Sequence, residues 1–235
     1  MCGRFTASFE FREIKVRWNL PGDLSFTPRY NIAPSQSVPV IIKVESGNEA
    51  KLMKWGLVPS WASDPSIGNR MINARAETLL EKPSFRNFVS QRRCLIPADG
   101  FYEWRRDGTR KVPVWIHLKK KEPFVFAGLW DSWRNVELGE ILDTFTIITT
   151  DPNTLLRPIH NRMPVIYDEP MGRHWLEHDH GGWSMGLAAA LRPWPSEYME
   201  AHDVSNFVNS PDNDAPECIR PLPPGYVRPG QLPLV

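Results

Sequence analysis

Residues 101–118 read FYEWRRDGTRKVPVWIHL and contain the clearest structural signal in this chain. Both ends of the segment are rich in β-branched and aromatic residues, which favour strands. Asp107-Gly108 lies between them and can take the positive φ values of a tight hairpin turn. The segment therefore predicts two antiparallel strands, Phe101–Arg105 and Val112–Leu118, joined by a short turn.

Strand-like runs of the same kind surround this hairpin, and helical patterns are fewer. The other expected strands are Val38–Val44, Lys51–Val58, Arg93–Pro97, Phe124–Leu129 and Phe145–Thr149. Between Ser8 and Leu20, apolar residues recur at helical spacing behind a candidate Ser8 cap, and shorter helices are expected near Ala76–Leu80, Phe85–Gln91, Pro170–His178 and Ser184–Leu191. The pattern predicts an α+β fold that is mainly antiparallel β-sheet, with a barrel-like core and peripheral helices.

The composition is that of an ordinary globular chain. Of its 235 residues, 41% are hydrophobic and 23% are charged, and no linker divides them. We therefore expect one domain over residues 1–220, followed by a Pro-rich tail over 221–235. No apolar run approaches the roughly 20 residues of a membrane span. Three scattered cysteines do not suggest disulfides or a CxxC metal site. A soluble intracellular protein with reduced thiols is the expectation, cytoplasmic in a bacterium or nuclear in a eukaryote.

Charge is distributed unevenly along the chain, although the formal net charge is only +1. Residues 1–130 carry 21 Lys and Arg against 12 Asp and Glu, whereas residues 131–235 carry 7 against 15. A basic half can attract phosphates locally, because salt screens the opposing field beyond roughly 8 Å. The alternative is that the two halves neutralise each other across the fold.

The start of the chain, Met1-Cys2-Gly3-Arg4, is its most unusual local feature. Removal of Met1 would leave a residue that bears both an α-amine and a thiol, with ordinary pKa values of about 7.7–8.0 and about 8.5. We therefore expect reactive fractions of both groups near neutral pH. Such an aminothiol condenses with an aldehyde to an imine and then closes to a thiazolidine. A second interpretation is a glutamine amidotransferase-type amidohydrolase, which also begins Met-Cys-Gly, and a third is a merely small second residue.

Further motifs distinguish these interpretations. They are CGR at 2–4, YNIAP at 30–34, WGLVPSW at 55–61, NARAE at 73–77, ADGFYEW at 98–104, IHNRMP at 159–164 and PEC at 216–218. Together and in this order, they resemble the SOS response-associated peptidase (SRAP) family of abasic-site-processing proteins over nearly the whole chain. The resemblance implies single-stranded DNA containing abasic sites as partner, a covalent crosslink through the N-terminal Cys, and self-processing that removes the first residue.

The resemblance also implies roles for individual residues. Cys2 is the nucleophile, Asn73 holds the N-terminus and the opened sugar, and Glu103 and His160 transfer protons. A partly buried Glu and a His suit proton transfer near pH 7. Glu103 stands among Phe101, Tyr102 and Trp104, where an acid without a role would cost stability. The implied DNA contacts are Arg4, Pro34, Trp61, Arg75, Thr149 and Arg162. Aromatic stacking and arginine–phosphate contacts bind unpaired strands without reading sequence.

One further motif suggests a zinc site. The segment His174-Trp175-Leu176-Glu177-His178 matches the H-x-x-E-H pattern of some zinc peptidases. Gly181-Gly182 follow it, as at a helix end, where histidines are favoured without any metal.

We expect no metal and no cofactor. We also expect a monomer, because one abasic site needs one N-terminus. A competing β-elimination at the imine predicts lyase activity beside the crosslink. A simple single-strand-binding module remains a non-enzymatic alternative.

Overall fold

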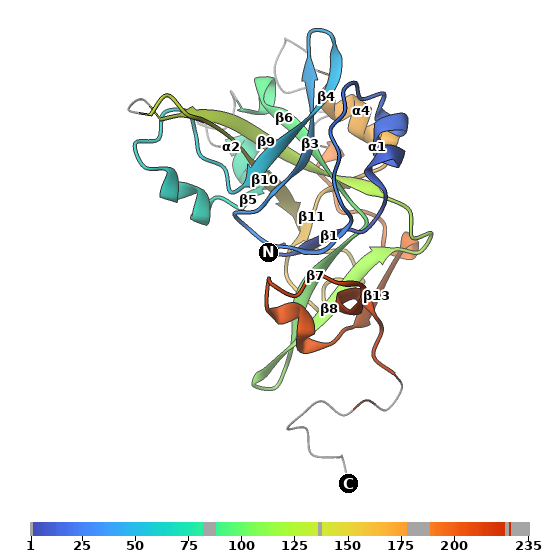
Figure 1. Cartoon of the computed structure of the whole chain (residues 1–235). Coiled ribbons are helices and arrows are strands. Elements are labelled where there is room, and N and C mark those ends of the chain that lie inside the picture. The colour runs from blue at the N-terminus through green and yellow to red at the C-terminus, as the bar shows by residue number, and fades with distance from the viewer. Residues whose placement is uncertain (1, 82–87, 136–137, 178–188, 224–225, 227–235) are drawn as a thin grey trace.

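The structure is a computed structural model that describes residues 2–81, 88–135, 138–177, 189–223 and 226 (Figure 1). Its centre is a closed ring of five strands in the order β10-β4-β3-β6-β9, with β9 pairing back to β10. Their bounds are β3 (Ser37–Val44), β4 (Gly47–Trp55), β6 (Arg93–Ala98), β9 (Phe124–Arg134) and β10 (Ile141–Thr150). All pairings in the ring are antiparallel except β10 with β4. The predicted α+β, barrel-like fold is confirmed.

The barrel carries three short additional strands that the sequence does not signal. β5 (Asn73–Arg75) lies parallel to β10, while β11 (Met163–Pro164) and β12 (Ile166–Tyr167) pair antiparallel with β10 and β9. Segments of two or three residues are too short to show alternation, and the pairing partner alone defines them. The strand expected over Lys51–Val58 ends instead at Trp55, because Gly56 turns the chain away with a φ of 126°.

The predicted hairpin belongs to a second, five-stranded sheet in the order β13-β8-β7-β1-β2. It consists of β7 (Gly100–Asp107) and β8 (Arg110–Leu118), with Asp107 opposite Arg110. The turn is Gly108-Thr109, and Gly108 has a φ of 59°. The other strands are β1 (Phe5–Ala7), β2 (Arg29–Ile32) and β13 (Met199–Asp203). In Figure 1 this sheet lies below the barrel, and the hairpin reaches away from it.

Helices lie at the periphery, as expected. They are α1 (Phe11–Trp18), α2 (Ala76–Glu81) and α4 (Glu169–Leu176), with 3-10 turns at Pro65–Arg70, Ser196–Tyr198, Asn206–Asn209 and Pro216–Ile219. Ser8 does not cap α1, which begins after Glu10 without a side-chain cap. The Ser8 hydroxyl donates to Asp99 instead, because β1 places it beside that carboxylate. Of the two other expected helices, residues 88–91 and 189–190 are helical, whereas 85–87 and 184–188 lie outside the described residues.

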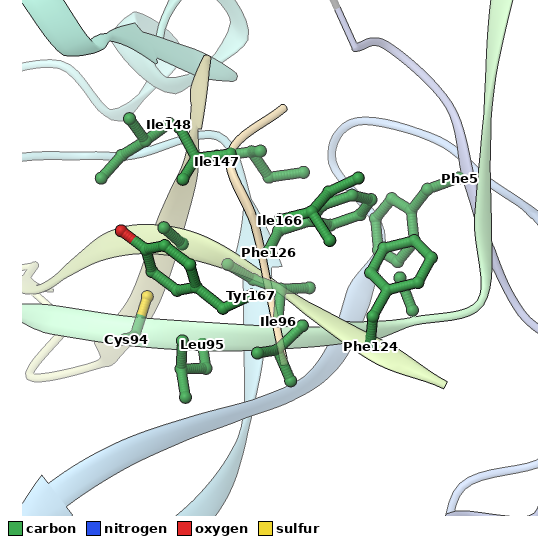
Figure 2. Packing of buried hydrophobic residues seen from close by; sticks show 14 of the residues in the cluster. Phe5, Cys94, Leu95, Ile96, Phe124, Phe126, Ile147, Ile148, Ile166 and Tyr167 are labelled. Carbon is green, nitrogen blue, oxygen red and sulfur yellow. The ribbon is translucent and has the colours of Figure 1, made fainter. Parts of the chain in front are cut away.

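The hydrophobic core extends from the barrel to the base of the second sheet. Phe5 of β1 is fully buried, and its ring centroid lies 5.1 Å from that of Trp55, edge-on. The Phe126 ring also meets Phe5 edge-on, at 5.7 Å between centroids (Figure 2). Burying such a ring contributes about 1.5–3 kcal/mol. Because Phe5 is three residues from Cys2, this packing fixes the position of the chain's start. The predicted tail begins with a bridge between Val204 and Pro221, and 224–225 and 227–235 lie outside the described residues.

Candidate active site and nucleic-acid interface

The N-terminal segment leads into β1, which lies between β7 and β2 in the second sheet. Phe5 of β1 pairs with Phe101 of β7, and the Tyr102 N–H donates to the Arg4 carbonyl at 2.9 Å. Cys2 precedes this strand, and its side chain is fully buried. The pairing therefore brings Cys2 to the part of β7 that carries Glu103.

Asn73 holds Cys2 from the barrel. It is the first residue of β5, where it pairs with Ile147 of β10. Its Nδ2 donates to the Cys2 carbonyl at 2.8 Å. Its Oδ1 is buried and has no hydrogen-bond partner within the described part of the chain. An unsatisfied buried amide oxygen is costly, so it marks a position where a further donor would be favoured.

Glu103 and His160 meet beside Cys2. Glu103 is only 3% exposed, and burial raises the pKa of its carboxyl to about 7. His160 Nδ1 lies 3.8 Å from Glu103 Oε1 and accepts the Arg162 backbone N–H at 3.1 Å. Burial lowers the pKa of His160. His160 is therefore neutral near pH 7, and Glu103 exchanges a proton in that range.

The state of the Cys2 thiol differs from the expectation based on free cysteine. Burial raises the pKa of Cys2 far above its ordinary range, and the negative charge of Glu103 raises it further. With Met1 attached, the Cys2 thiol is therefore protonated near neutral pH. The thiolate fraction expected after Met1 removal stays a prediction. Thiolate formation at this position requires water, substrate or a proton acceptor to reach the sulfur.

A cavity of about 500 Å³ opens at these residues. It is lined by Glu103, Trp104, Arg106, Lys111, His160 and Asn209. Four of the six were not identified from the sequence as site residues. Strand alternation could not have found them from Glu103, because Trp104 and Arg106 share one face of β7 and Glu103 belongs to the other. Asn209 comes from the 3-10 turn at Asn206–Asn209, which is distant in sequence, and no local sequence pattern indicates that Asn209 belongs to the site.

Trp61 is an exposed aromatic residue among the predicted DNA contacts. It is 71% exposed, although residues 55–59 just before it are buried. Its loop is fixed from both sides: the Ser60 N–H donates to Asp131 at 2.6 Å, and the Trp133 indole N–H donates to the Ala62 carbonyl at 2.7 Å. Such a pre-formed aromatic surface can stack on an unpaired base with little ordering cost.

Three other predicted DNA contacts differ in how far their side chains are exposed to solvent. Arg75 is exposed at the end of β5, and Pro34 is half-buried. Thr149 is fully buried, and its hydroxyl donates to the Ala74 carbonyl at 3.4 Å. Arg75 therefore has a side chain that can meet a phosphate directly, whereas the Thr149 side chain lies beneath the surface.

Arg4 and Arg162 are already bound within the protein. Arg4 donates to Asn31 Oδ1 at 2.6 Å and to the Val208 carbonyl at 2.9 Å. Arg162 binds both oxygens of Glu77 at 2.9 Å and also contacts Asp151 at 3.1 Å. A phosphate would reach Arg162 by replacing one of these carboxylates. In the described structure, both arginines brace the site.

The zinc-like motif gains no support. His174 lies exposed in the last turn of α4, while His178 and His180 fall outside the described residues. Within the described ranges, no group of three His, Cys, Asp or Glu side chains could hold a metal ion. Among those same residues, no helix is long and apolar enough to cross a membrane.

Comparisons with known proteins place the chain in a class. The family model described as SOS response associated peptidase (SRAP) matches residues 1–211. The chain belongs to this family. In Bacillus subtilis, the abasic site processing protein YoqW is 48% identical over 223 residues, which cover 93% of this chain and 99% of that protein.

Two further relatives extend the likeness. Abasic site processing protein HMCES of Gallus gallus is 33% identical over 265 residues, covering 94% of this chain and 78% of that protein. The X-ray structure of a Bacteroides thetaiotaomicron protein has a TM-score of 0.84 at 30% identity, covering 94% of this chain and all of the other. The fold described above is thus shared with a solved structure.

Proposed function

We propose that this protein processes abasic sites in single-stranded DNA by forming a covalent thiazolidine between Cys2 and the opened sugar. Removal of Met1, by self-processing or by another peptidase, frees the α-amine. The observation that carries the proposal is the convergence on Cys2 of the Asn73 amide, at 2.8 Å from its carbonyl, and of the Glu103–His160 pair. The names of the relatives support abasic sites as the substrate.

The first step joins the amine to the DNA. The α-amine of Cys2 attacks the C1′ aldehyde of the ring-opened sugar, and a proton passes from nitrogen to oxygen to give a carbinolamine. Loss of the hydroxyl as water then gives an imine. Glu103, with a pKa of about 7, can supply that proton and take one back near neutrality.

The second step makes the adduct stable. The Cys2 sulfur adds to the imine carbon, the imine electrons move to nitrogen, and nitrogen takes up the proton lost by the thiol. The five-membered ring forms without any leaving group, and the reaction is intramolecular. The imine also acidifies the neighbouring C2′, so β-elimination of the 3′ phosphate competes and cuts the strand. His160, 3.8 Å from Glu103, is placed to relay protons in either path.

One experiment tests the proposal against its alternatives. The protein, with Met1 removal verified by mass spectrometry, is incubated with a single-stranded oligonucleotide that carries one abasic site and is then run on a denaturing gel. We expect a shifted band that survives denaturation and is absent for the undamaged strand. A thiol amidohydrolase or a simple binding module gives no such band, and its absence would refute the proposal.

Replacing Glu103 with Gln should slow adduct formation by roughly 10²–10⁴-fold at pH 7, because an amide neither donates nor accepts the required proton. Affinity for undamaged single strands should stay nearly unchanged. The rate–pH profile of the unmodified protein should bend near pH 7, and that bend should be missing in Glu103→Gln. A loss that lies wholly in affinity would assign Glu103 to binding instead.

The pH dependence of stability provides a control for the same variant, and the direction of the expected change is defined. Because the folded pKa of Glu103 is raised from 4.5 to about 7, its contribution to stability is fully present below pH 4.5 and declines as pH rises through 7. Urea unfolding of Glu103→Gln should lack this decline. A profile identical to that of the unmodified protein would show that Glu103 is not the buried titrating group.

Replacing Trp61 with Ala should weaken binding to undamaged single strands by about 1–3 kcal/mol, the usual value of one stacked base. Fluorescence anisotropy of a labelled oligonucleotide measures this. Tyr198→Ala removes another exposed aromatic ring, outside the site, and should leave affinity unchanged. Equal losses in both variants would contradict a stacking role specific to Trp61.

A further inference from the structure

Two cations face each other across the β7–β8 hairpin at the catalytic cavity. Arg106 on β7 and Lys111 on β8 are direct cross-strand partners. Both are exposed, and both line the cavity that contains Glu103 and His160. The hairpin thus brings two positive charges to the space where the proposed reaction occurs.

This arrangement does not stabilise the fold by itself. Like charges directly opposite each other on an antiparallel pair repel. Within the described residues, neither Arg106 nor Lys111 has an ion pair or a side-chain hydrogen bond. Their neighbour Arg105, in contrast, holds both oxygens of Asp203 at 2.9 and 2.8 Å.

The contrast extends to the arginines suggested by sequence. Arg4 is bound to Asn31, and Arg162 is bound to Glu77 and Asp151, so their charges are used inside the protein. Arg106 and Lys111 keep their charges available to an incoming anion. An anion between them would also remove their mutual repulsion, which favours binding.

We propose that Arg106 and Lys111 form a phosphate-binding site for the DNA strand beside the abasic sugar. This inference rests on the proposed function, because it assumes that the sugar enters the cavity at Glu103. Arg106 lies three residues along β7 from Glu103, or about 10 Å at 3.3 Å per residue. At that separation, the cation pair can contact a phosphate that neighbours the abasic sugar along the strand.

The surroundings of the cation pair fit an extended strand. Trp104 forms the adjoining wall, where its indole N–H donates to Asn209 Oδ1 at 2.9 Å and the Arg4 guanidinium lies 5.8 Å from its ring centroid. In Figure 1, β1, which follows Cys2 in the chain, lies between the barrel and the β7–β8 hairpin. A DNA strand bound at Cys2 would thus lie close to the hairpin that carries the cation pair.

The test compares two charge-matched double variants. Arg106→Ala with Lys111→Ala removes the proposed site, and Arg12→Ala with Lys43→Ala removes one exposed arginine and one exposed lysine from α1 and β3. For undamaged single strands, we expect roughly tenfold weaker binding only in the first. The slope of log affinity against log salt should fall by about 1.4 for two lost phosphate contacts.

A second measurement separates charge from folding and locates the phosphate. The exchange variant Arg106→Lys with Lys111→Arg conserves both charges and should bind like the unmodified protein. Single methylphosphonate linkages, placed stepwise on each side of the abasic site, remove one negative charge at a time. One position should weaken binding to the unmodified protein and have no further effect on the Arg106→Ala/Lys111→Ala variant.

The experiments distinguish a failure of the proposed function from a failure of this inference. If the unmodified protein forms no denaturation-resistant adduct, the proposed function fails. If it forms the adduct but the two double variants bind equally well, or no methylphosphonate position depends on the cation pair, this inference is overturned while the proposed function stands.

Discussion

Protein carrying Cys2→Ser should form no denaturation-resistant adduct with an abasic single strand, yet borohydride should still trap it on the DNA. The α-amine survives the substitution and still forms the imine. A hydroxyl is a far poorer nucleophile than a thiolate, and its ring product reverts in water. Strand incision should persist and can rise, because the ring closure that competes with β-elimination is lost. Cys2→Ala should behave in the same way.

The Cys2→Ser experiment needs an intact fold and a free N-terminus. Cys2 is fully buried, so the fold is checked by thermal unfolding, and Met1 removal by mass spectrometry. An amidohydrolase that attacks through the Cys2 sulfur predicts loss of every activity in both variants, without trapped DNA. If borohydride captured nothing from correctly processed and folded Cys2→Ser protein, the imine pathway would be wrong.

Any residue retained before Cys2 should abolish the stable adduct. An acylated amine is an amide, whose nitrogen cannot condense with an aldehyde, so neither imine nor thiazolidine can form. The structure adds a steric reason: Cys2 is buried, and its carbonyl is fixed by Asn73 at 2.8 Å, which leaves little freedom to reposition the chain's start. Protein with an uncleaved N-terminal tag is the measured variant, and both the gel shift and borohydride trapping should be lost.

The control for the tagged protein is the same preparation after cleavage with a protease that leaves Cys2 as the first residue. Activity should return in full on cleavage, while the affinity of tagged protein for undamaged single strands should be reduced only modestly. Normal rates of stable adduct formation by verified tagged protein would exclude the thiazolidine mechanism.

Much of the fold follows from local sequence. Gly108 supplies the positive φ between two strand-forming runs, so the hairpin 101–118 was predictable from its own residues. β1, β5 and β13 were not, because short strands acquire their identity from partners such as β7, β10 and β8. Ser8 illustrates the same limit at a helix start: its hydroxyl bonds Asp99, a residue 91 positions away.

The sequence by itself determined the family, because motifs in a fixed order are a property of the covalent order along the chain. It also predicted the reactive group, an aminothiol at Cys2. Tertiary structure alone decided the protonation chemistry. Burial places the Glu103 pKa near 7 and suppresses ionisation of Cys2, and desolvation depends on which segments pack together. It likewise decided which arginines are free: Arg162 is neutralised by Glu77, 85 residues away, whereas Arg106 faces Lys111 across a strand pair. The sequence shows which residues are charged, but the fold determines which residue each charged side chain contacts.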